Sequence, residues 1–219
     1  MSKLIDYISF GSSYLPLIFG LFLFKKHSRD IRLFIYYFSF TAFTDLAVLV
    51  TGVNGMNNLI ILNFYSLLET YFLLYLFNLC TENKSYKVAL KIVAILFTFV
   101  WVWINLFENS LYTFNPIDKG IKCLLFIILT VWLLNILSKN IQIQLNKDYR
   151  FWFLIAFLLY FSMTFIIYST ATWYINDIQN EAMRYTWYFH SIVTIITNLI
   201  LTYGIICFYQ NRNLYSSLP

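Results

Sequence analysis

Seven stretches of mostly apolar residues run through the sequence and constrain its fold more than any other feature. The third, from Leu59 to Cys80, reads LIILNFYSLLETYFLLYLFNLC. Roughly twenty consecutive apolar residues are enough to cross the hydrocarbon core of a bilayer as an α-helix. The sequence therefore predicts an all-α, polytopic membrane bundle that forms a single transmembrane domain over residues 1–219. The predicted transmembrane helices cover residues 8–24, 31–53, 59–80, 88–107, 121–137, 151–172 and 187–209.

The composition agrees with a location in the membrane. Of the 219 residues, 60% are hydrophobic and only 11% are charged, whereas about a quarter of the residues in a typical soluble domain are charged. A soluble fold of this length could not bury so much apolar surface. The formal net charge of +5 does not indicate a nucleic-acid partner, because the basic residues lie in short loops between the apolar stretches.

The distribution of Lys and Arg predicts how the chain is threaded, because basic residues are enriched in the cytoplasmic loops of membrane proteins. With the N-terminus outside, most of the 15 basic residues are cytoplasmic, namely Lys25, Lys26, Arg29, Arg32, Lys84, Lys87, Lys91, Lys139, Lys147, Arg150 and Arg212. The remaining ones, Lys3, Lys119, Lys122 and Arg184, fall on the outer side. We therefore predict an external N-terminus and a cytoplasmic C-terminus.

Two acidic residues lie well inside the apolar stretches, Asp45 in the second and Glu69 in the third. At a rise of 1.5 Å per residue, they lie about 12 and 16 Å from the turn that joins these two helices. The two carboxyl groups are therefore expected near one another in the outer half of the membrane. At least one should then be protonated at neutral pH, because adjacent carboxylates repel each other. Ionisable residues inside a span are functional candidates.

Each of these acids has a hydroxyl-bearing residue four positions earlier, Thr41 before Asp45 and Tyr65 before Glu69. Residues four apart lie on the same face of a helix. We therefore expect each hydroxyl group to form a hydrogen bond to the carboxyl group that follows it.

The last apolar stretch carries a polar stripe at helical spacing, formed by His190, Thr194, Thr197 and Asn198. We predict an outward-facing polar cluster between helices 31–53, 59–80 and 187–209. Its candidate ligand- or proton-binding residues are Asp45, Glu69, His190, Asn198, Thr41, Tyr65 and Thr194. In the alternative interpretation, the Asn and Thr side chains join helices through structural hydrogen bonds, and His190 is an interfacial side chain.

At Asn57-Asn58, Glu69 and the run TWYFHSIVTIITNLI, the sequence resembles small uncharacterised bacterial seven-helix integral membrane proteins. These proteins share a short asparagine turn before an acidic third helix and a His-Ser pair that opens the last helix. The resemblance implies a multi-pass protein of the bacterial cytoplasmic membrane and implies no particular activity. Microbial rhodopsins fit poorly, because residues 187–209 contain no lysine, and ceramidase-like hydrolases fit poorly, because His190 is followed by Thr194 rather than a second histidine.

The sequence predicts no cofactor, no metal site and no catalytic residue. Cys80, Cys123 and Cys207 are widely separated, and isolated thiols on apolar helices are usually packing residues. No Cys or His spacing typical of a zinc site is present.

Three functions remain open. The first is a non-enzymatic membrane sensor or accessory subunit, since the short loops leave no room for a catalytic soluble domain. Its partners would be the lipid bilayer, a signalling or other membrane protein, and a small-molecule or proton ligand. The second is a proton- or ion-coupled transporter of a small solute, since intramembrane carboxyl groups are typical coupling sites. The third is an intramembrane hydrolase that uses Asp45, Glu69 and His190 for acid–base chemistry.

Overall fold

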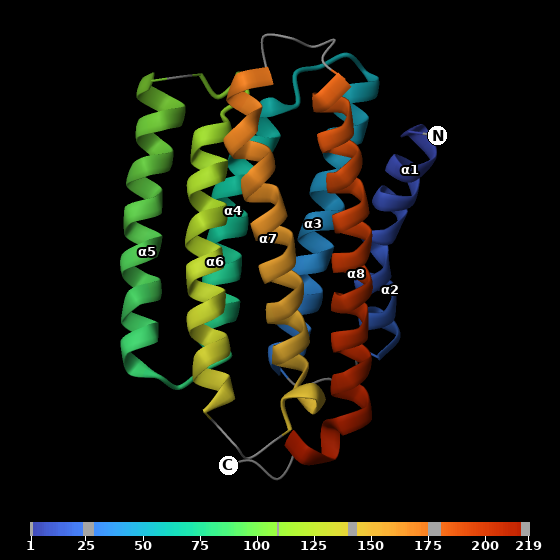
Figure 1. The fold of residues 1–219 in the computed structure, drawn as a ribbon, viewed down its shortest axis with the longest axis vertical. Coiled ribbons are helices and arrows are strands. Elements are labelled where there is room, and N and C mark those ends of the chain that lie inside the picture. Colours follow the sequence, from blue (N-terminus) through green and yellow to red (C-terminus); the bar gives the residue numbers. More distant parts are fainter. Residues whose placement is uncertain (1, 24–28, 109, 140–143, 175–180, 216–219) are drawn as a thin grey trace.

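The computed structural model describes residues 2–23, 29–108, 110–139, 144–174 and 181–215, and these residues form helices and connecting turns without a strand (Figure 1). The elements are α1 (Ser2–Ser12), α2 (Tyr14–Leu23), α3 (Arg29–Val53), α4 (Leu59–Leu79), α5 (Lys84–Val102), η2 (Trp103–Glu108), α6 (Pro116–Ser138), η3 (Leu145–Lys147), α7 (Tyr149–Tyr174) and α8 (Glu181–Tyr215). Within the described residues, seven helical segments are long and apolar enough to cross a membrane. The prediction of an all-α bundle is therefore confirmed, and the fold is compatible with a multi-pass membrane protein.

The first predicted helix, 8–24, is interrupted in the structure. The helix α1 ends at Ser12 and α2 begins at Tyr14. The interruption follows from Pro16, which has no N–H group to donate to the carbonyl group of Ser12 four residues earlier. Residue 24, at the predicted end of this helix, lies outside the described residues. The two short helices together still have the length of one span, Leu4–Leu23.

The helices α5 and α6 begin earlier than predicted. The Asn83 side chain accepts a hydrogen bond from the backbone N–H of Tyr86, which starts α5 at Lys84 instead of residue 88. Pro116 occupies the first turn of α6, where its missing N–H group costs nothing. The earlier start adds Lys119 to the helix, which already contained Lys122 in the predicted range 121–137; both lysines were predicted on the outer side of the membrane.

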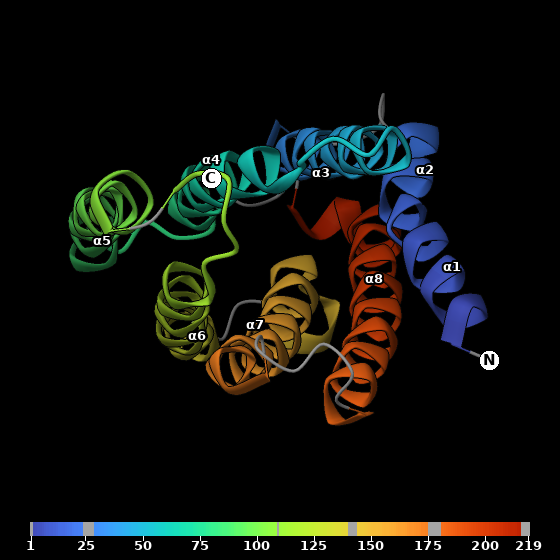
Figure 2. The same cartoon turned by 90° about the horizontal axis from the view of Figure 1, so that it is seen from above.

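The helices are arranged in two rows when the bundle is viewed along its axis (Figure 2). One row contains α5, α4, α3 and α2, with α5 at its outer edge, and the other contains α6, α7 and α8. The helices α1 and α2 both pack against α8 at the edge opposite α5. This arrangement places α4 beside α6, so that groups from these two helices can meet inside the bundle.

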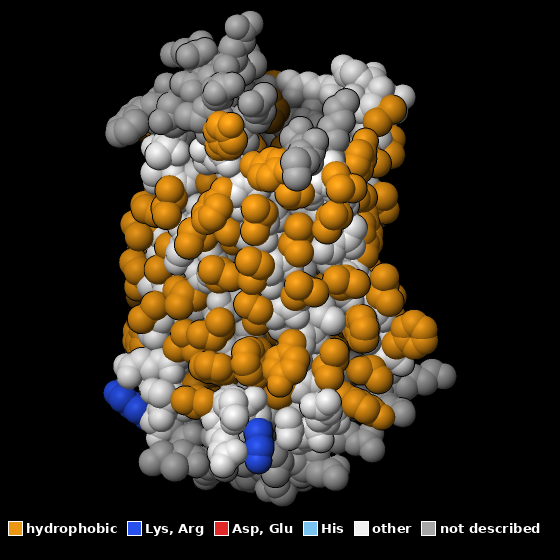
Figure 3. Space-filling model, turned by 45° about the vertical axis from the view of Figure 1, so that its right-hand side comes forward, with side chains coloured by type: hydrophobic (Ala, Val, Ile, Leu, Met, Phe, Trp, Pro, Cys, Tyr) orange, Lys and Arg blue, Asp and Glu red, His pale blue; other side chains and the backbone are white. Residues whose placement is uncertain are grey.

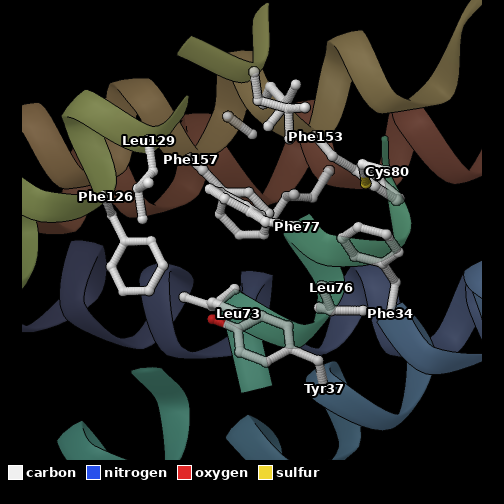
Figure 4. Close-up of a cluster of buried hydrophobic side chains, with 14 of the residues drawn as sticks. Phe34, Tyr37, Leu73, Leu76, Phe77, Cys80, Phe126, Leu129, Phe153 and Phe157 are labelled. Carbon is white, nitrogen blue, oxygen red and sulfur yellow. The ribbon is translucent and has the colours of Figure 1, made fainter. Parts of the chain in front are cut away.

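Aromatic side chains fill the space between the two rows (Figure 4). The ring centroids of Phe34 and Phe153 lie 4.3 Å apart, which joins α3 to α7. The rings of Phe77 and Phe126 join α4 to α6 at 5.7 Å in an edge-to-face arrangement. Such ring pairs stabilise helix contacts beyond the area that they bury.

The α1 helix begins and the α8 helix ends at opposite ends of the bundle (Figure 1), as an odd number of spans requires. Apolar side chains cover the flank of the bundle, and the blue Lys and Arg side chains visible in Figure 3 lie near one end. The same end contains the starts of α5 and α7, with Lys84, Lys147 and Arg150. Lys25 and Lys26 of the first loop lie outside the described residues, whereas Arg29 and Arg32 belong to the first turn of α3.

Candidate functional site

Glu69 lies about halfway along α4 and is only 5% exposed. Three side chains from three helices donate hydrogen bonds to its carboxylate. The Lys122 ammonium group lies 2.7 Å from Oε2, and the hydroxyl groups of Tyr65 and Tyr37 lie 2.9 and 3.0 Å from Oε1. The negative charge of Glu69 is therefore balanced by a cation and saturated with donors inside the bundle.

The position of each partner follows from local structure. The predicted hydrogen bond between Tyr65 and Glu69, one turn apart on α4, is confirmed. Thr41 of α3 lies 3.3 Å from the Tyr65 hydroxyl group and donates to the backbone carbonyl of Tyr37. The predicted hydrogen bond from Thr41 to Asp45 is therefore wrong, because Thr41 uses its hydroxyl proton within its own helix and faces α4.

Lys122 is the main group that the sequence analysis missed. Six residues separate it from Pro116, which corresponds to about 9 Å along the helix, and its long side chain bridges to Glu69. The distribution of basic residues between the two sides of the membrane predicts on which side Lys122 lies. It does not predict which neighbouring helix the Lys122 side chain faces. Lys122 could have been considered as a partner, because an acidic residue inside a span requires one. Lys122 is a basic residue near the start of a predicted helix.

Asp45 has a different environment, although it also lies within a candidate span. It is half-buried, and its Oδ2 lies 3.5 Å from the Ser13 hydroxyl oxygen, at the interruption between α1 and α2. The Ser13 hydroxyl group donates to the carbonyl of Phe10 at 2.7 Å. Among the described residues, no Lys, Arg or His side chain lies within 4.0 Å of the Asp45 carboxyl group.

The expected contact between Asp45 and Glu69 is not formed as a hydrogen bond in the described part of the chain. Glu69 is paired with Lys122 of α6, whereas Asp45 contacts Ser13 at the other edge of the row. The two acids remain within electrostatic range of each other. The two acids are separated because of how α3 is rotated about its axis. Tyr37 and Thr41 lie on the side of α3 that faces α4, whereas Asp45 lies on the side that faces α2.

The polar residues of α8 face α1 and α7 instead of the two acids. Asn198 donates a 2.9 Å hydrogen bond to the hydroxyl oxygen of Ser12, and Thr194 donates to the carbonyl of its own helix at His190. The His190 ring lies 5.8 Å from Tyr160 and 5.9 Å from Trp187. The predicted cluster between helices 31–53, 59–80 and 187–209 is thus divided, and only its α3 and α4 members meet.

Tyr160 of α7 is a further polar residue of the interior, and nothing in the sequence distinguishes it from the other tyrosines. Its ring packs against His190 of α8. The tyrosine hydroxyl groups that donate to Glu69 come from α3 and α4.

A second buried polar network lies at the ends of α4, α5 and α6 near the loop that precedes α6. The Lys119 ammonium group donates to Asn63 Oδ1 at 2.8 Å and lies 3.7 Å from the Asp118 carboxylate. Asn105, in the π-helical turn η2, donates to Asp118 at 3.4 Å and receives a hydrogen bond from Asn115. These five residues are all at most 5% exposed, so this network also belongs to the interior.

The described residues do not form a metal site. They contain no group of three or more His, Cys, Asp or Glu side chains that could hold a metal ion. A groove of about 300 Å³ between α3 and α4 is lined by apolar and aromatic side chains, including Phe40, Phe64 and Tyr65. Tyr65 lines this groove and also donates a hydrogen bond to Glu69.

Comparison with known proteins adds no name to this site: no protein-family model, curated protein or solved structure matches the chain.

Proposed function

We propose that the protein is a non-enzymatic, multi-pass membrane sensor or accessory subunit, and that Asp45 is its proton-binding group. The observation that carries this proposal is the carboxyl group of Asp45, which lies inside a candidate span without a cationic partner among the described residues. A carboxylate in such a position is costly unless it takes up a proton or a cation. Its protonation state is therefore free to respond to the surroundings.

The contact with Ser13 gives the Asp45 carboxyl group little support for a negative charge. A serine hydroxyl group has a single proton, and Ser13 can donate it either to Oδ2 of Asp45 at 3.5 Å or to the carbonyl oxygen of Phe10 at 2.7 Å. The shorter distance favours the carbonyl group. Ionisation of Asp45 would therefore place a poorly stabilised charge beside the interrupted first span.

The interruption at Ser13 supplies an element that can move. Between α1 and α2 the helical hydrogen bonds are broken near Pro16, so the two short helices can tilt separately at low cost. The helices α1 and α2 pack mainly against α8. A change at Asp45 would therefore be passed to α8. We propose that α8 ends on the cytoplasmic side, because the loops predicted on that side of the protein carry most of its Lys and Arg residues.

The experiment measures whether Asp45 controls the position of α1. Spin labels are attached at Ile8→Cys and Leu49→Cys, on exposed faces of α1 and α3, in a variant whose three native cysteines are replaced by alanine. Distance distributions are recorded in lipid nanodiscs at about pH 5 and about pH 8, which bracket the range in which a partly buried carboxyl group can ionise. We expect two populations whose ratio changes with pH, and no change with pH in Asp45→Asn.

The matched control is Glu82→Gln, which removes an exposed carboxylate at the start of α5. It should keep the pH response of the parent. Identical distributions at both pH values in the parent would contradict the proposal, and so would a pH response that persists unchanged in Asp45→Asn.

A second candidate function, a proton-coupled carrier of a small solute, is favoured by the same interrupted helix. Discontinuous spans beside an ionisable residue are a recurring feature of carrier binding sites. Proteoliposomes with a pH gradient distinguish the two functions. Solute uptake that depends on the pH gradient and is lost in Asp45→Asn would show that the protein is a carrier and not a sensor. A pH-dependent conformational change without solute flux would favour the sensor.

A further inference from the structure

Two helices present matching polar residues to each other in the interior of the bundle. On α4, Asn63, Ser66 and Glu69 follow at intervals of three residues, and on α6 Lys119 and Lys122 do the same. Asn63 accepts a hydrogen bond from Lys119, and Glu69 accepts one from Lys122. Because residues three apart lie about one turn apart on the same face, Ser66 lies between these two contacts.

Ser66 is one of several described residues with a buried polar atom that has no hydrogen-bond partner, and it is the one that lies between the two lysine contacts. Its side chain is 1% exposed, and its hydroxyl oxygen has no hydrogen-bond partner among the described residues. Leaving a buried polar group unpaired destabilises the fold. A bound water molecule can supply the partner that the protein does not.

Lys122 provides an independent indication at the same level of the bundle. An ammonium group carries three donors, and within the described residues Lys122 makes a single hydrogen bond, to Glu69. The side chain is 7% exposed, so bulk solvent does not supply the remaining acceptors. An oxygen atom between Ser66 and Lys122 would satisfy both residues.

We propose that a water molecule is bound between α4 and α6, where it accepts a hydrogen bond from Lys122 and donates one to Ser66. The water would join the Lys119–Asn63 network to the Glu69–Lys122 pair, giving one continuous polar column from the outer ends of these helices to the middle of the bundle. A neutral ligand fits this position, because the carboxylates of Asp118 and Glu69 balance the two lysines. A bound water requires two to four polar partners, and the column offers that number.

The proposal is independent of the one made for Asp45, which lies at the edge of the bundle near α2. The failure of either would leave the other intact.

The test is the sign of the change in melting temperature caused by Ser66→Ala in purified, detergent-solubilised protein. If Ser66 has no partner, removing its hydroxyl group should leave the melting temperature unchanged or raise it, because an unsatisfied group is removed. If the water is bound, the variant should melt about 2–4 °C lower. Thr130→Val is the control, since Thr130 of α6 is also buried with an unpartnered hydroxyl group, and it should not lower the melting temperature.

A double-mutant cycle separates the water from a simple loss of packing. In a background with Glu69→Leu and Lys122→Met, no ammonium group remains to hold the water, so Ser66→Ala should no longer lower the melting temperature. An equal decrease in both backgrounds would overturn the proposal, as would a decrease in neither.

Discussion

At the scale of single residues, the two acids inside the spans differ in how their charge is accommodated. Glu69 has a cation and two hydroxyl donors within 3.0 Å, and these contacts join three helices. Asp45 has one long contact, to a serine hydroxyl group that lies closer to the carbonyl oxygen of Phe10. The first arrangement favours stability, and the second leaves a carboxyl group that can change its state.

The Glu69–Lys122 pair leads to a prediction about stability. Lys122→Met should lower the free energy of unfolding by about 3–5 kcal/mol, because it leaves a buried carboxylate without a cation. Combining it with Glu69→Leu should restore most of the loss, since no buried charge then remains. Unfolding in mixed micelles, followed by circular dichroism, measures both effects.

The control for this prediction is Lys87→Met, which removes a lysine from its pair with Glu82. The two side chains are 29% and 93% exposed, so their attraction is screened by water and the variant should unfold like the parent. If Lys122→Met were equally harmless, Glu69 would have to be protonated in the fold.

At the scale of helices, close packing depends on a few small residues. A Cβ atom on Gly204 of α8 would lie 2.6 and 2.7 Å from ring atoms of Phe153 and 3.4 Å from Cβ of Trp152, both on α7. Small residues allow membrane helices to approach closely. The α7–α8 contact therefore depends on Gly204, and the polar residues of α8 are oriented by it.

We predict that Gly204→Ala lowers the free energy of unfolding by about 1–3 kcal/mol, because the added methyl group would displace the Phe153 ring. Gly11→Ala in α1 is the matched control, since a Cβ atom there meets no heavy atom within 4 Å. It should be neutral or slightly stabilising, as alanine favours helix formation over glycine. Equal unfolding curves for the two variants would show that α7 and α8 are not packed at this point.

At the scale of the whole molecule, the threading of the chain can be tested directly. Lys84→Cys, Lys147→Cys and Met56→Cys each place a thiol at an exposed position, with Met56 in the turn before α4. In intact cells expressing a variant without native cysteines, a membrane-impermeant thiol reagent should label only Met56→Cys, and the two lysine positions should be labelled after permeabilisation. Labelling of Lys84→Cys and Lys147→Cys on opposite sides would contradict the seven-span topology.

The seven candidate spans and their helical structure were predictable from the sequence because they depend on local composition. Each apolar stretch must hide its backbone polar groups in a helix to enter a bilayer, so the spans follow from the stretches themselves. The hydrogen bond between Tyr65 and Glu69 was predictable for the same reason, since both residues lie on one helix. The interruption at Ser13 also has a local cause, because Pro16 lies in the same apolar stretch and lacks the N–H group that would continue the helix.

The partners of the acids were decided only by the tertiary structure, because they depend on how each helix is rotated toward its neighbours. In sequence, Asp45 and Glu69 are equivalent acids at similar depths, and Lys122 is one basic residue of 15. Because α4 packs against α6, Lys122 forms its hydrogen bond with Glu69. Because α3 lies beside α2, Asp45 contacts Ser13 instead. Hydrophobicity determines that a helix is inserted, but side-chain packing determines which face it turns inward, and that choice separates the paired acid from the unpaired one.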